Sequence, residues 1–413
     1  MHASAGCSRP HLRMLAGRWV APPLAVIALA LGGCGGESAR DTSNAASDRP
    51  TASGEGENAA DRRRRAVEAG RAAAKKTGDL AKEDPVSVPP KKLGILVVYA
   101  NNETAIDMRD AVKAASAVLG WQTLDCDAEG NPARMATCAE SLLNQNVDAL
   151  VTMTTESAPI AKQLARAKAA GIPTISFGGN VTPNPLFTVQ YGLDETKLSH
   201  LVNRYLIEQL EQAGDAPTIA LQSFPHVFLG KQREDALRQD VAETGVEIVD
   251  MHQSDLANVA DDARRATESQ LTANPELDAI WVGVNFGFPH VGQVVSSRNG
   301  GKSFPERPLV VGFVDDSINL DALRKGWGDA VATHPYSPQG WIVVDQLAER
   351  FARERPFEPD AMQRSEELYG LDFFEASLVT QDTVPPAPQR VPLPEDPEAF
   401  FEAKWAQEFG DVK

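Results

Sequence analysis

The sequence is poor in cysteine and in basic charge. Its 413 residues contain four cysteines, which excludes a small scaffold held together mainly by disulfides. Acidic residues outnumber basic ones by 57 to 40, a formal net charge of −17, and no face of basic residues opposes that field. We therefore expect no nucleic-acid partner. At this length the chain has room for about two domains, each with its own core.

The common sequence signatures of enzymes are also missing. Neither GxSxG nor HExxH occurs, and the seven histidines form no pair with metal-ligand spacing. Gly300-Gly301-Lys302-Ser303 is similar to the end of a Walker A loop, but Ser296 stands where the first glycine is required. We therefore expect a binding protein with no catalytic residues, no metal and no cofactor. An enzyme built on the same scaffold is a remote alternative.

The apolar run near the N-terminus is too short to cross a bilayer. Val20 to Leu31 has 12 residues, follows Arg13 and Arg18, and has the length of a signal-peptide core. It leads into Leu31-Gly32-Gly33-Cys34, which resembles a bacterial lipobox, whose cysteine is lipidated and becomes the mature N-terminus. We expect residues 1–33 to be a lipoprotein signal peptide and Cys34 to carry the lipid. An ordinary cleavable signal with an incidental cysteine is the alternative.

The next segment has almost no large apolar side chains, so it cannot bury enough surface to offset its ordering entropy. We expect residues 34–90 to be the lipidated cysteine followed by a disordered tether. Within it, Ala59 to Glu83 is rich in alanine and is open to partial helix formation. Arg62 to Arg65 are either solvated or in contact with anionic lipid.

From residue 91 onward, buried strands alternate with helices. Leu93 to Tyr99 is a nearly continuous aliphatic run, typical of a strand buried on both faces of a parallel sheet. Further strands are predicted at 121–125, 147–153, 172–177, 217–224, 246–251, 277–284, 309–313 and 328–333. Helices are predicted at 104–119, 132–143, 157–170, 193–213, 229–243, 258–273, 317–325 and 338–353. Because parallel strands need helical crossovers, the fold class is α/β with doubly wound parallel sheets.

The second half of this pattern repeats the first. Asn146-Val147-Asp148-Ala149-Leu150 corresponds to Glu276-Leu277-Asp278-Ala279-Ile280, and each segment leads from a helix into a buried strand. The sequence therefore predicts two similar lobes.

Several short sequence segments, in a fixed order, resemble those of a known protein family. They are Lys92–Asn102, Asn146–Leu150, Ala170–Thr174, Val310–Phe313, Ala332–Gly340 and Ser377–Asp382. Together they resemble the periplasmic ribose/galactose-type sugar-binding proteins over about residues 91 to 385. The resemblance implies a type I periplasmic binding fold, with two lobes joined by a three-segment hinge and a sugar-like ligand clamped between them. It also implies delivery of the ligand to an ABC permease in the membrane.

The resemblance also implies domain boundaries. Lobe one is expected at 91–191 plus 335–364, lobe two at 192–334 plus 365–385, and a C-terminal tail at 386–413 packing on the lobes. Such a protein is expected to be lipid-anchored and extracytoplasmic. It captures a small molecule for an ABC importer. The alternative is a sensor that presents its ligand to a receptor or kinase.

Ligands of open α/β sheets bind outside the carboxyl ends of the strands. Polar and aromatic residues at those ends suit hydrogen bonding to hydroxyls and apolar contact. Some of them have an alternative role, since Asp316 or Ser317 can cap the next helix and Asn101 can form an Asx turn. The candidate ligand-binding residues are Asn101, Asn102, Glu103, Thr155, Glu156, Asn180, Phe224, Asn285, Phe286, Asp315 and His334.

The chain departs from the family pattern in the cleft. Thr104 and Ala105 stand where the sugar binders have paired stacking aromatics, and Phe286 replaces an aspartate. Asp315 keeps its register only through a one-residue insertion, Val314. A simple free pyranose is therefore a poor expectation, and aromatic residues near the strand ends supply either apolar surface for a less polar ligand or lobe core. These aromatics are Tyr99, Phe224, Phe228, Phe286 and Phe288.

Cys126 and Cys138 are the only cysteines of the globular region. Export to an oxidising compartment and a loop of about a dozen residues favour a disulfide between them. Two buried thiols are the alternative.

Overall fold

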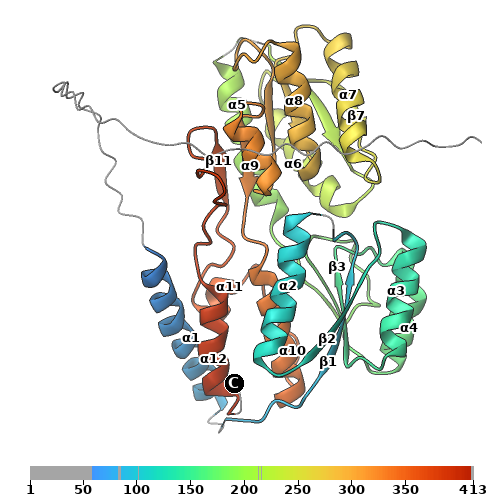
Figure 1. Cartoon of the computed structure of the whole chain (residues 1–413), viewed down its shortest axis with the longest axis vertical. Coiled ribbons are helices and arrows are strands. Elements are labelled where there is room, and N and C mark those ends of the chain that lie inside the picture. Colours follow the sequence, from blue (N-terminus) through green and yellow to red (C-terminus); the bar gives the residue numbers. More distant parts are fainter. Residues whose placement is uncertain (1–57, 82–84, 101, 213, 215, 411–413) are drawn as a thin grey trace, which may run out of the picture. The chain divides into compact units, whose positions relative to one another are not determined.

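The structure is a computed structural model that describes residues 58–81, 85–100, 102–212, 214 and 216–410. Its core is built on two separate sheets, one of five strands and one of six (Figure 1). We call the five-stranded sheet with its helices lobe one, and the six-stranded sheet with its helices lobe two. The predicted α/β class with two doubly wound parallel-sheet lobes is confirmed.

Lobe one has the strand order β2-β1-β3-β4-β5, with all strands parallel. Every residue of β3 and β4 is buried, as the aliphatic runs predict for strands covered on both faces. The strands are β1 (Lys92–Val97), β2 (Gln122–Asp127), β3 (Ala149–Met153), β4 (Thr174–Phe177) and β5 (Val189–Gln190). The helices are α2 (Glu103–Val118), α3 (Pro132–Asn144), the short η1 (Ala158–Ile160) and α4 (Ala161–Ala169). Later in the chain, α10 (Pro338–Arg353) returns to pack on α2.

Lobe two repeats this order and adds one antiparallel edge strand, giving β11-β10-β9-β8-β6-β7. Its strands are β6 (Thr218–Ser223), β7 (Glu247–Gln253), β8 (Ala279–Val282), β9 (Leu309–Phe313), β10 (Ala330–Thr333) and β11 (Ser377–Thr380). Its helices are α5 (Glu195–Glu211), α6 (Phe228–Val241), α7 (Val259–Ala273), the short η2 (Asn285–Gly287), α8 (Phe288–Arg298) and α9 (Ser317–Arg324).

The repeated sequence phrase has the same structural role in both lobes. The carboxylate of Asp148 accepts a hydrogen bond from the backbone N–H of Lys92 at the start of β1, at 2.8 Å. The carboxylate of Asp278 accepts one from the backbone N–H of Thr218 at the start of β6, at 2.7 Å. Each aspartate therefore ties the entry of one strand to the start of its neighbour, which explains why the phrase occurs twice.

Besides the short α11 (Ser365–Tyr369), two helices were not predicted. One is α8, which begins with Pro289 in its first turn and buries Val291 and Val295 one turn apart. The other is α12 (Pro397–Glu408), which has Asp396 as its N-cap, accepting from the backbone N–H of Ala399 at 2.9 Å. Proline in the first turn and a capping aspartate are both start signals, so the sequence did contain the evidence for these helices.

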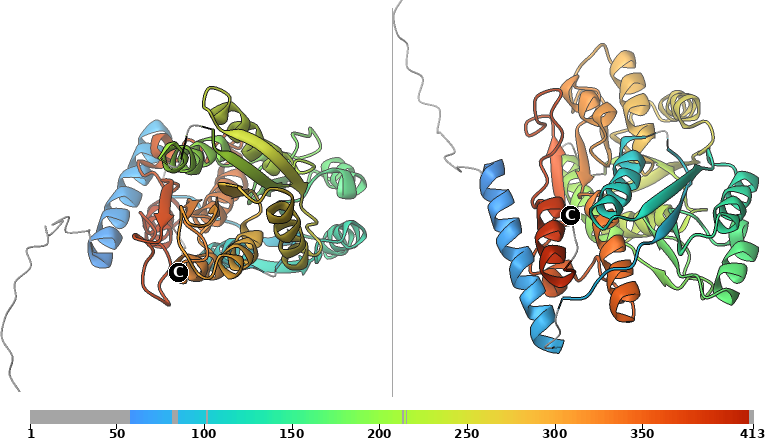
Figure 2. Two further views of the ribbon diagram at one scale, coloured as in Figure 1. Left: turned by 90° about the horizontal axis from the view of Figure 1, so that it is seen from above. Right: turned by 60° about the horizontal axis from the view of Figure 1, so that its bottom comes forward.

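The expectation of a disordered tether through residue 90 is wrong for α1 (Ala59–Ala81), where the helical alternative is confirmed: α1 is a helix packed along α12 (Figures 1 and 2). Small residues allow this contact: Ala66 and Ala73 are buried, and a Cβ added at Gly70 would lie 2.3 Å from the backbone oxygen of Phe400. Such close approach buries surface without large side chains, which a count of large apolar residues overlooks. Residues 34–57, including Cys34, lie outside the described residues.

The arginines of α1 are engaged with the C-terminal segment of the chain. Arg63 pairs with Asp396 at 3.4 Å, and Arg65 pairs with Glu395 at 2.9 Å. Arg65 also donates to the backbone oxygen of Pro394 at 3.1 Å. These two side chains therefore bind protein groups, which neither of the alternatives weighed for the arginine run, solvent or lipid, anticipated.

Candidate ligand-binding site

A cavity of about 680 Å³ lies at the carboxyl ends of the strands, lined by residues of both lobes. Besides residues that follow β2, β4, β7, β9 and β10, the lining comes from the segments that follow β1 and β3 in lobe one and from those that follow β6 and β8 in lobe two. These strand pairs are the points where the strand order of each sheet reverses, which is where α/β sheets bind ligands. We call this cavity the cleft.

Five of the predicted site residues line the cleft. Lobe one contributes Asn102 and Glu156, and lobe two contributes Phe224, Asn285 and Phe286. The amide oxygen of Asn102 also caps α2 by accepting from the backbone N–H of Ala105 at 2.9 Å. Nothing in the structure identifies a ligand, so ligand contact by these residues stays a prediction.

Some of the aromatic residues near the strand ends line the cleft, and others belong to the core of a lobe. Tyr99 lines the cleft together with Phe224 and Phe286, whereas Phe288 is fully buried in the core of lobe two. Burial, followed by the charge of Asp255, raises the pKa of the Tyr99 hydroxyl above its usual value. Tyr99 is therefore a neutral hydrogen-bonding group at physiological pH.

Direct hydrogen bonds join the lobes beside the cleft. The carboxylate of Asp316 accepts from the backbone N–H and the hydroxyl of Thr104, at 3.0 and 2.6 Å, and from Nδ2 of Asn285 at 3.0 Å. In the opposite direction, the carboxylate of Glu103 accepts from the backbone N–H of Ser317 at 2.6 Å. At the N-terminus of each of α2 and α9, a carboxylate thus accepts hydrogen bonds from the other lobe. Glu103 therefore lies in an interlobe contact and not in the cleft lining.

Burial raises the pKa of Asp316, while the hydrogen bonds from Thr104 and the charge of Arg390 act in the opposite direction. Asp316 is the first residue before α9, but its side chain makes no capping hydrogen bond to that helix. The helix-cap alternative for Asp316 is therefore wrong as regards its side chain, which bridges the lobes instead.

The residue expected to face the ligand at this position, Asp315, turns elsewhere. It accepts from the hydroxyl of Thr333 at 2.7 Å and lines a second cavity of about 480 Å³. The preceding Val314 has a φ of 69°, a left-handed conformation that is unusual for a β-branched residue, and it lines the cleft itself. The inserted valine thus changes which side chain the strand end presents to the cleft.

Three further predicted residues also lie outside the cleft lining. Thr155 is buried and donates to the backbone oxygen of Met153 at 3.1 Å. Asn180 donates to the backbone oxygen of Leu193 at 2.9 Å and to Gln232 at 2.7 Å, at the first connection between the lobes. His334 lines the second cavity. Asn101 lies outside the described residues.

A buried charged group behind the cleft was not predicted. Arg233 donates from Nε and Nη2 to Glu195, both at 2.9 Å, and from Nη1 to the backbone oxygen of Gly283, also at 2.9 Å. Its guanidinium lies 4.2 Å from the ring centre of Phe313. Arg233 lines the cleft, but all of these contacts fix it to lobe two, and no sequence motif signals the pairing of residues so far apart.

His334 lies beside this pair as a neutral group. Its Nε2 is 3.9 Å from Glu195 and has no hydrogen-bond partner among the described residues. Burial is the largest influence and lowers its pKa to about 4, although the charge of Glu195 acts in the opposite direction. An uncharged imidazole at the connection between β10 and α10 needs less hydration than an imidazolium would.

The predicted disulfide between Cys126 and Cys138 is present, with an S–S distance of 2.01 Å. It joins the end of β2 to α3 within lobe one. Cys34, the predicted lipidation site, lies outside the described residues. None of the helices among the described residues is long and apolar enough to cross a membrane.

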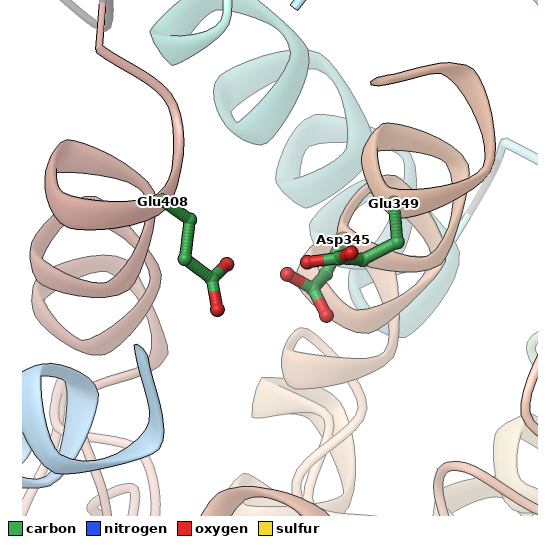
Figure 3. Close-up of side chains that lie close together, drawn as sticks. All are labelled: Asp345, Glu349 and Glu408. Atoms are coloured by element: carbon green, nitrogen blue, oxygen red, sulfur yellow. The ribbon is translucent and has the colours of Figure 1, made fainter. Parts of the chain in front are cut away.

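One cluster of carboxylates has the spacing of a metal site. Asp345 and Glu349 of α10 face Glu408 of α12, and one oxygen of each lies within 4.8 Å of the others (Figure 3). The ammonium of Lys404 lies 2.7, 3.4 and 2.5 Å from Asp345, Glu349 and Glu408. Lys404 thus supplies a cation to all three carboxylates, and Arg355 also pairs with Glu349 at 2.9 Å. We interpret the cluster as a buried salt-bridge network that fastens α12 to α10.

Comparisons with known proteins agree with this geometry. The model of the periplasmic binding protein domain family matches residues 93–354. The ribose import binding protein of Bacillus subtilis is 21% identical over 236 residues, which cover 56% of this chain and 71% of that protein. That protein and the solved structures described next are named as sugar import or ABC transport components.

Two solved structures show the same fold. A periplasmic ribose ABC transporter protein from Conexibacter woesei has a TM-score of 0.60 and 18% identity, covering 72% of this chain and 95% of its own. The binding protein of the arabinose ABC transporter from Shewanella sp. ANA-3, bound to arabinofuranose, has a TM-score of 0.56 and 18% identity, covering 71% and 93%. With a family model matching more than half of its length, the chain belongs to the periplasmic binding protein domain family.

Proposed function

We propose that this protein is a lipid-anchored, extracytoplasmic solute-binding protein that captures a small sugar-like molecule and delivers it to an ABC importer. The observation that carries the proposal is the cleft, which both lobes line at their strand-order reversals. Membership of the family implies an extracytoplasmic location. Relatives named as ribose and arabinose transport components support the sugar class.

The mechanism we propose is hinge closure. A ligand that contacts both lobes binds the closed arrangement more tightly than the open one, and this difference in affinity drives closure. The chain crosses between the sheets at 190–195, 333–338 and 370–377, and these crossings are the hinge. A permease then distinguishes loaded from empty protein by the relative position of the two lobes.

The decisive experiment is mass spectrometry of small molecules released from the purified, denatured protein, followed by small-angle scattering with and without the molecule found. We expect a more compact particle on binding. Scattering profiles that superimpose at saturating ligand would count against closure. Stimulation of ATP hydrolysis by a permease complex from the same genome tests delivery, whereas activation of a receptor or kinase would favour sensing.

The anchor requires its own test. We expect wild-type protein to partition with membranes, because acylation contributes about 0.8 kcal/mol per buried methylene. Cys34→Ser should be released into the soluble fraction. A Cys34→Ser protein that stays with the membrane would disprove Cys34 as the anchor but leave the solute-binding role untouched.

A further inference from the structure

Many polar side chains of the cleft already form hydrogen bonds with other protein groups. We call a polar atom without such a bond uncommitted. Thr104 donates to Asp316, Thr154 donates to the backbone oxygen of Gly178 at 2.9 Å, and Arg233 is held by Glu195. A sugar hydroxyl that is buried without a partner costs free energy, so a ring with hydroxyls on every side needs many uncommitted groups. These three side chains do not supply them.

The uncommitted polar atoms are few. Among the described residues, Nδ2 of Asn102, Oδ1 of Asn285, the ring nitrogens of His226 and the hydroxyls of Tyr99 and Tyr336 line the cleft without a hydrogen bond to protein. Glu156 and Asp255 add carboxylates that are partly used, since they accept from the backbone N–H groups of Thr182 and Ala257. This set satisfies one polar edge of a ligand, not its whole surface.

The rest of the lining is apolar. Three methionines, Met108, Met135 and Met153, line the cleft together with Leu256 and Phe286. Methionine adapts its shape and makes favourable contacts with aromatic rings. The volume of about 680 Å³ lies in the middle of the range of about 300–1,000 Å³ for sites of drug-sized molecules, so it holds more than one sugar ring.

We infer that the ligand is a glycoside, a sugar bonded to an apolar or aromatic aglycone, rather than a free sugar. The sugar edge binds the uncommitted amides of Asn102 and Asn285, and the aglycone packs on the methionine-lined wall. This inference rests on the proposed function, because it names the ligand class of the same cleft.

The test compares matched ligands by titration calorimetry: D-galactose, methyl β-D-galactopyranoside and phenyl β-D-galactopyranoside, and D-ribose against adenosine. We expect the aryl member of at least one series to bind about tenfold tighter or more than its free sugar, because it buries more apolar area. Leu256→Ser should reduce this preference at least threefold. The control Ile318→Ser replaces an exposed apolar residue outside the cleft and should leave the preference unchanged.

The outcomes separate the two proposals. A free sugar that binds as tightly as its aryl glycoside, with closure seen by scattering, overturns the glycoside inference and leaves the proposed function standing. If none of the five compounds binds, the glycoside inference is overturned. If in addition the purified protein releases no small molecule, the proposed function is overturned too.

A separate observation concerns the segment after β11. Residues 381–396 leave the sheet of lobe two and reach α12, which packs on α10 and α2 of lobe one. On the lobe-two side, Arg324 of α9 donates to the backbone oxygens of Pro385 and Gln389 at 2.9 and 2.6 Å. This segment is a fourth crossing between the lobes within the described residues, one more than the three-segment hinge that the resemblance implies.

Within this fourth crossing, Arg390 contacts both lobes at once. Its Nη1 donates to the carboxylate of Asp107 on α2, in lobe one. Its Nε donates to the backbone oxygen of Asp315 at 3.4 Å, and its Nη2 lies 3.7 Å from the carboxylate of Asp315, in lobe two. One guanidinium therefore links a lobe-one carboxylate to a lobe-two carboxylate, and opening the lobes has to break at least one of these links.

We propose that Arg390 acts as a positioning residue that favours the closed arrangement of the lobes. The pair is partly exposed, with 31% of the Arg390 side chain and 41% of the Asp107 side chain accessible, so salt should weaken it. The control is Arg324→Ala, which loosens the same segment from lobe two without removing a link between the lobes.

Small-angle scattering of the ligand-free protein tests this. We expect Arg390→Ala to shift the closure equilibrium toward the open form by about threefold to fivefold at low salt. Wild type should approach the variant at about 1 M NaCl, where the Debye length is about 3 Å, and Arg324→Ala should resemble wild type. Identical profiles for wild type and Arg390→Ala at low salt, or equal effects of the two substitutions, would overturn the role of Arg390.

Discussion

The two lobes share a strand order but differ in what covers them. In lobe two, the described helices α5 to α9 all belong to the strand–helix repeat itself. Lobe one carries an additional layer, in which α12 packs on α10 and α2, and α1 packs on α12. Aromatic rings fill the contact: Trp341 of α10 stacks on Phe401 of α12, with ring centres 6.2 Å apart, and Trp405 lies 5.9 Å from Trp341.

This difference assigns different mechanical roles to the lobes. Both ends of the described chain, α1 and α12, are fastened to lobe one. If Cys34 carries the lipid, as we propose, the membrane connection enters through α1 and holds lobe one. Lobe two is then the half that moves when the cleft opens and closes.

The largest expected effect is on the added layer. Lys404→Met removes the cation beside Asp345 and Glu408, while Arg355 still pairs with Glu349, and leaving buried charges unpaired costs about 3–5 kcal/mol. We expect the free energy of unfolding to fall by that amount. Hydrogen exchange should speed up in α12 and α1, while β6, β8 and β9 of lobe two keep their protection.

The matched control is Lys113→Met, which breaks an ion pair with Asp125 whose side chains are 40% and 35% accessible. This variant should lose less than about 1 kcal/mol. Equal loss of protection in both lobes of the Lys404→Met protein would show that the added layer stabilises the whole molecule rather than lobe one alone.

The sequence predicted the lobes well because their central strands, such as β3, β4, β8 and β9, are buried on both faces and have aliphatic sequences. It also led to the cleft, since strand ends in α/β sheets converge. It did not predict the added layer: α1 packs through Ala66, Gly70 and Ala73, and small residues of this kind are also common in disordered segments.

Within the cleft, prediction failed where the outcome depends on how the lobes meet. Asn102 and Asn285 line the cleft as expected, but Asp315 turns away because Val314 adopts a left-handed conformation. The bridge from Asp316 to Thr104 joins residues 212 positions apart, and no local pattern encodes it. His334 is buried by the surrounding lobe, and burial of a single residue cannot be read from its neighbours in sequence.

A smaller effect is expected at the cleft, where both lobes should contribute. Asn102→Ala on lobe one and Asn285→Ala on lobe two should each weaken binding of the ligand released from the protein by about 1.5–3 kcal/mol. Asn144→Ala, an exposed asparagine at the end of α3, is the control and should bind as wild type does. Calorimetry that finds a loss for only one of the two cleft variants would mean that ligand is held by one lobe, and closure would lose its driving force.

The smallest expected effect is a difference in how the stability contributions of the added layer and of the hinge depend on pH. Burial raises the pKa of Glu408 to about 7, although Lys404 acts in the opposite direction. The folded protein then holds a proton that the unfolded chain releases near pH 4.5, so the contribution of Glu408 to stability falls as pH rises from about 4.5 to about 7. His334 behaves oppositely: its pKa of about 4 lies below the ordinary 6.5, so its contribution falls as pH drops from about 6.5 to about 4.

Between about pH 4.5 and 6.5 the two effects oppose each other, and substitution separates them. Relative to wild type, Glu408→Gln should gain about 1 kcal/mol in the free energy of unfolding for each pH unit between pH 5 and 6.5. The reason is that unfolding of wild type releases the proton of Glu408, whereas the amide of the variant has no such proton to release. His334→Gln should show the reverse trend over the same interval. Urea unfolding at several pH values measures both, and hydrogen exchange assigns the Glu408 effect to α12. If Glu408→Gln and wild type keep a constant difference across this range, the carboxyl group of Glu408 titrates alike in the folded and unfolded chains, and the added layer is insensitive to pH.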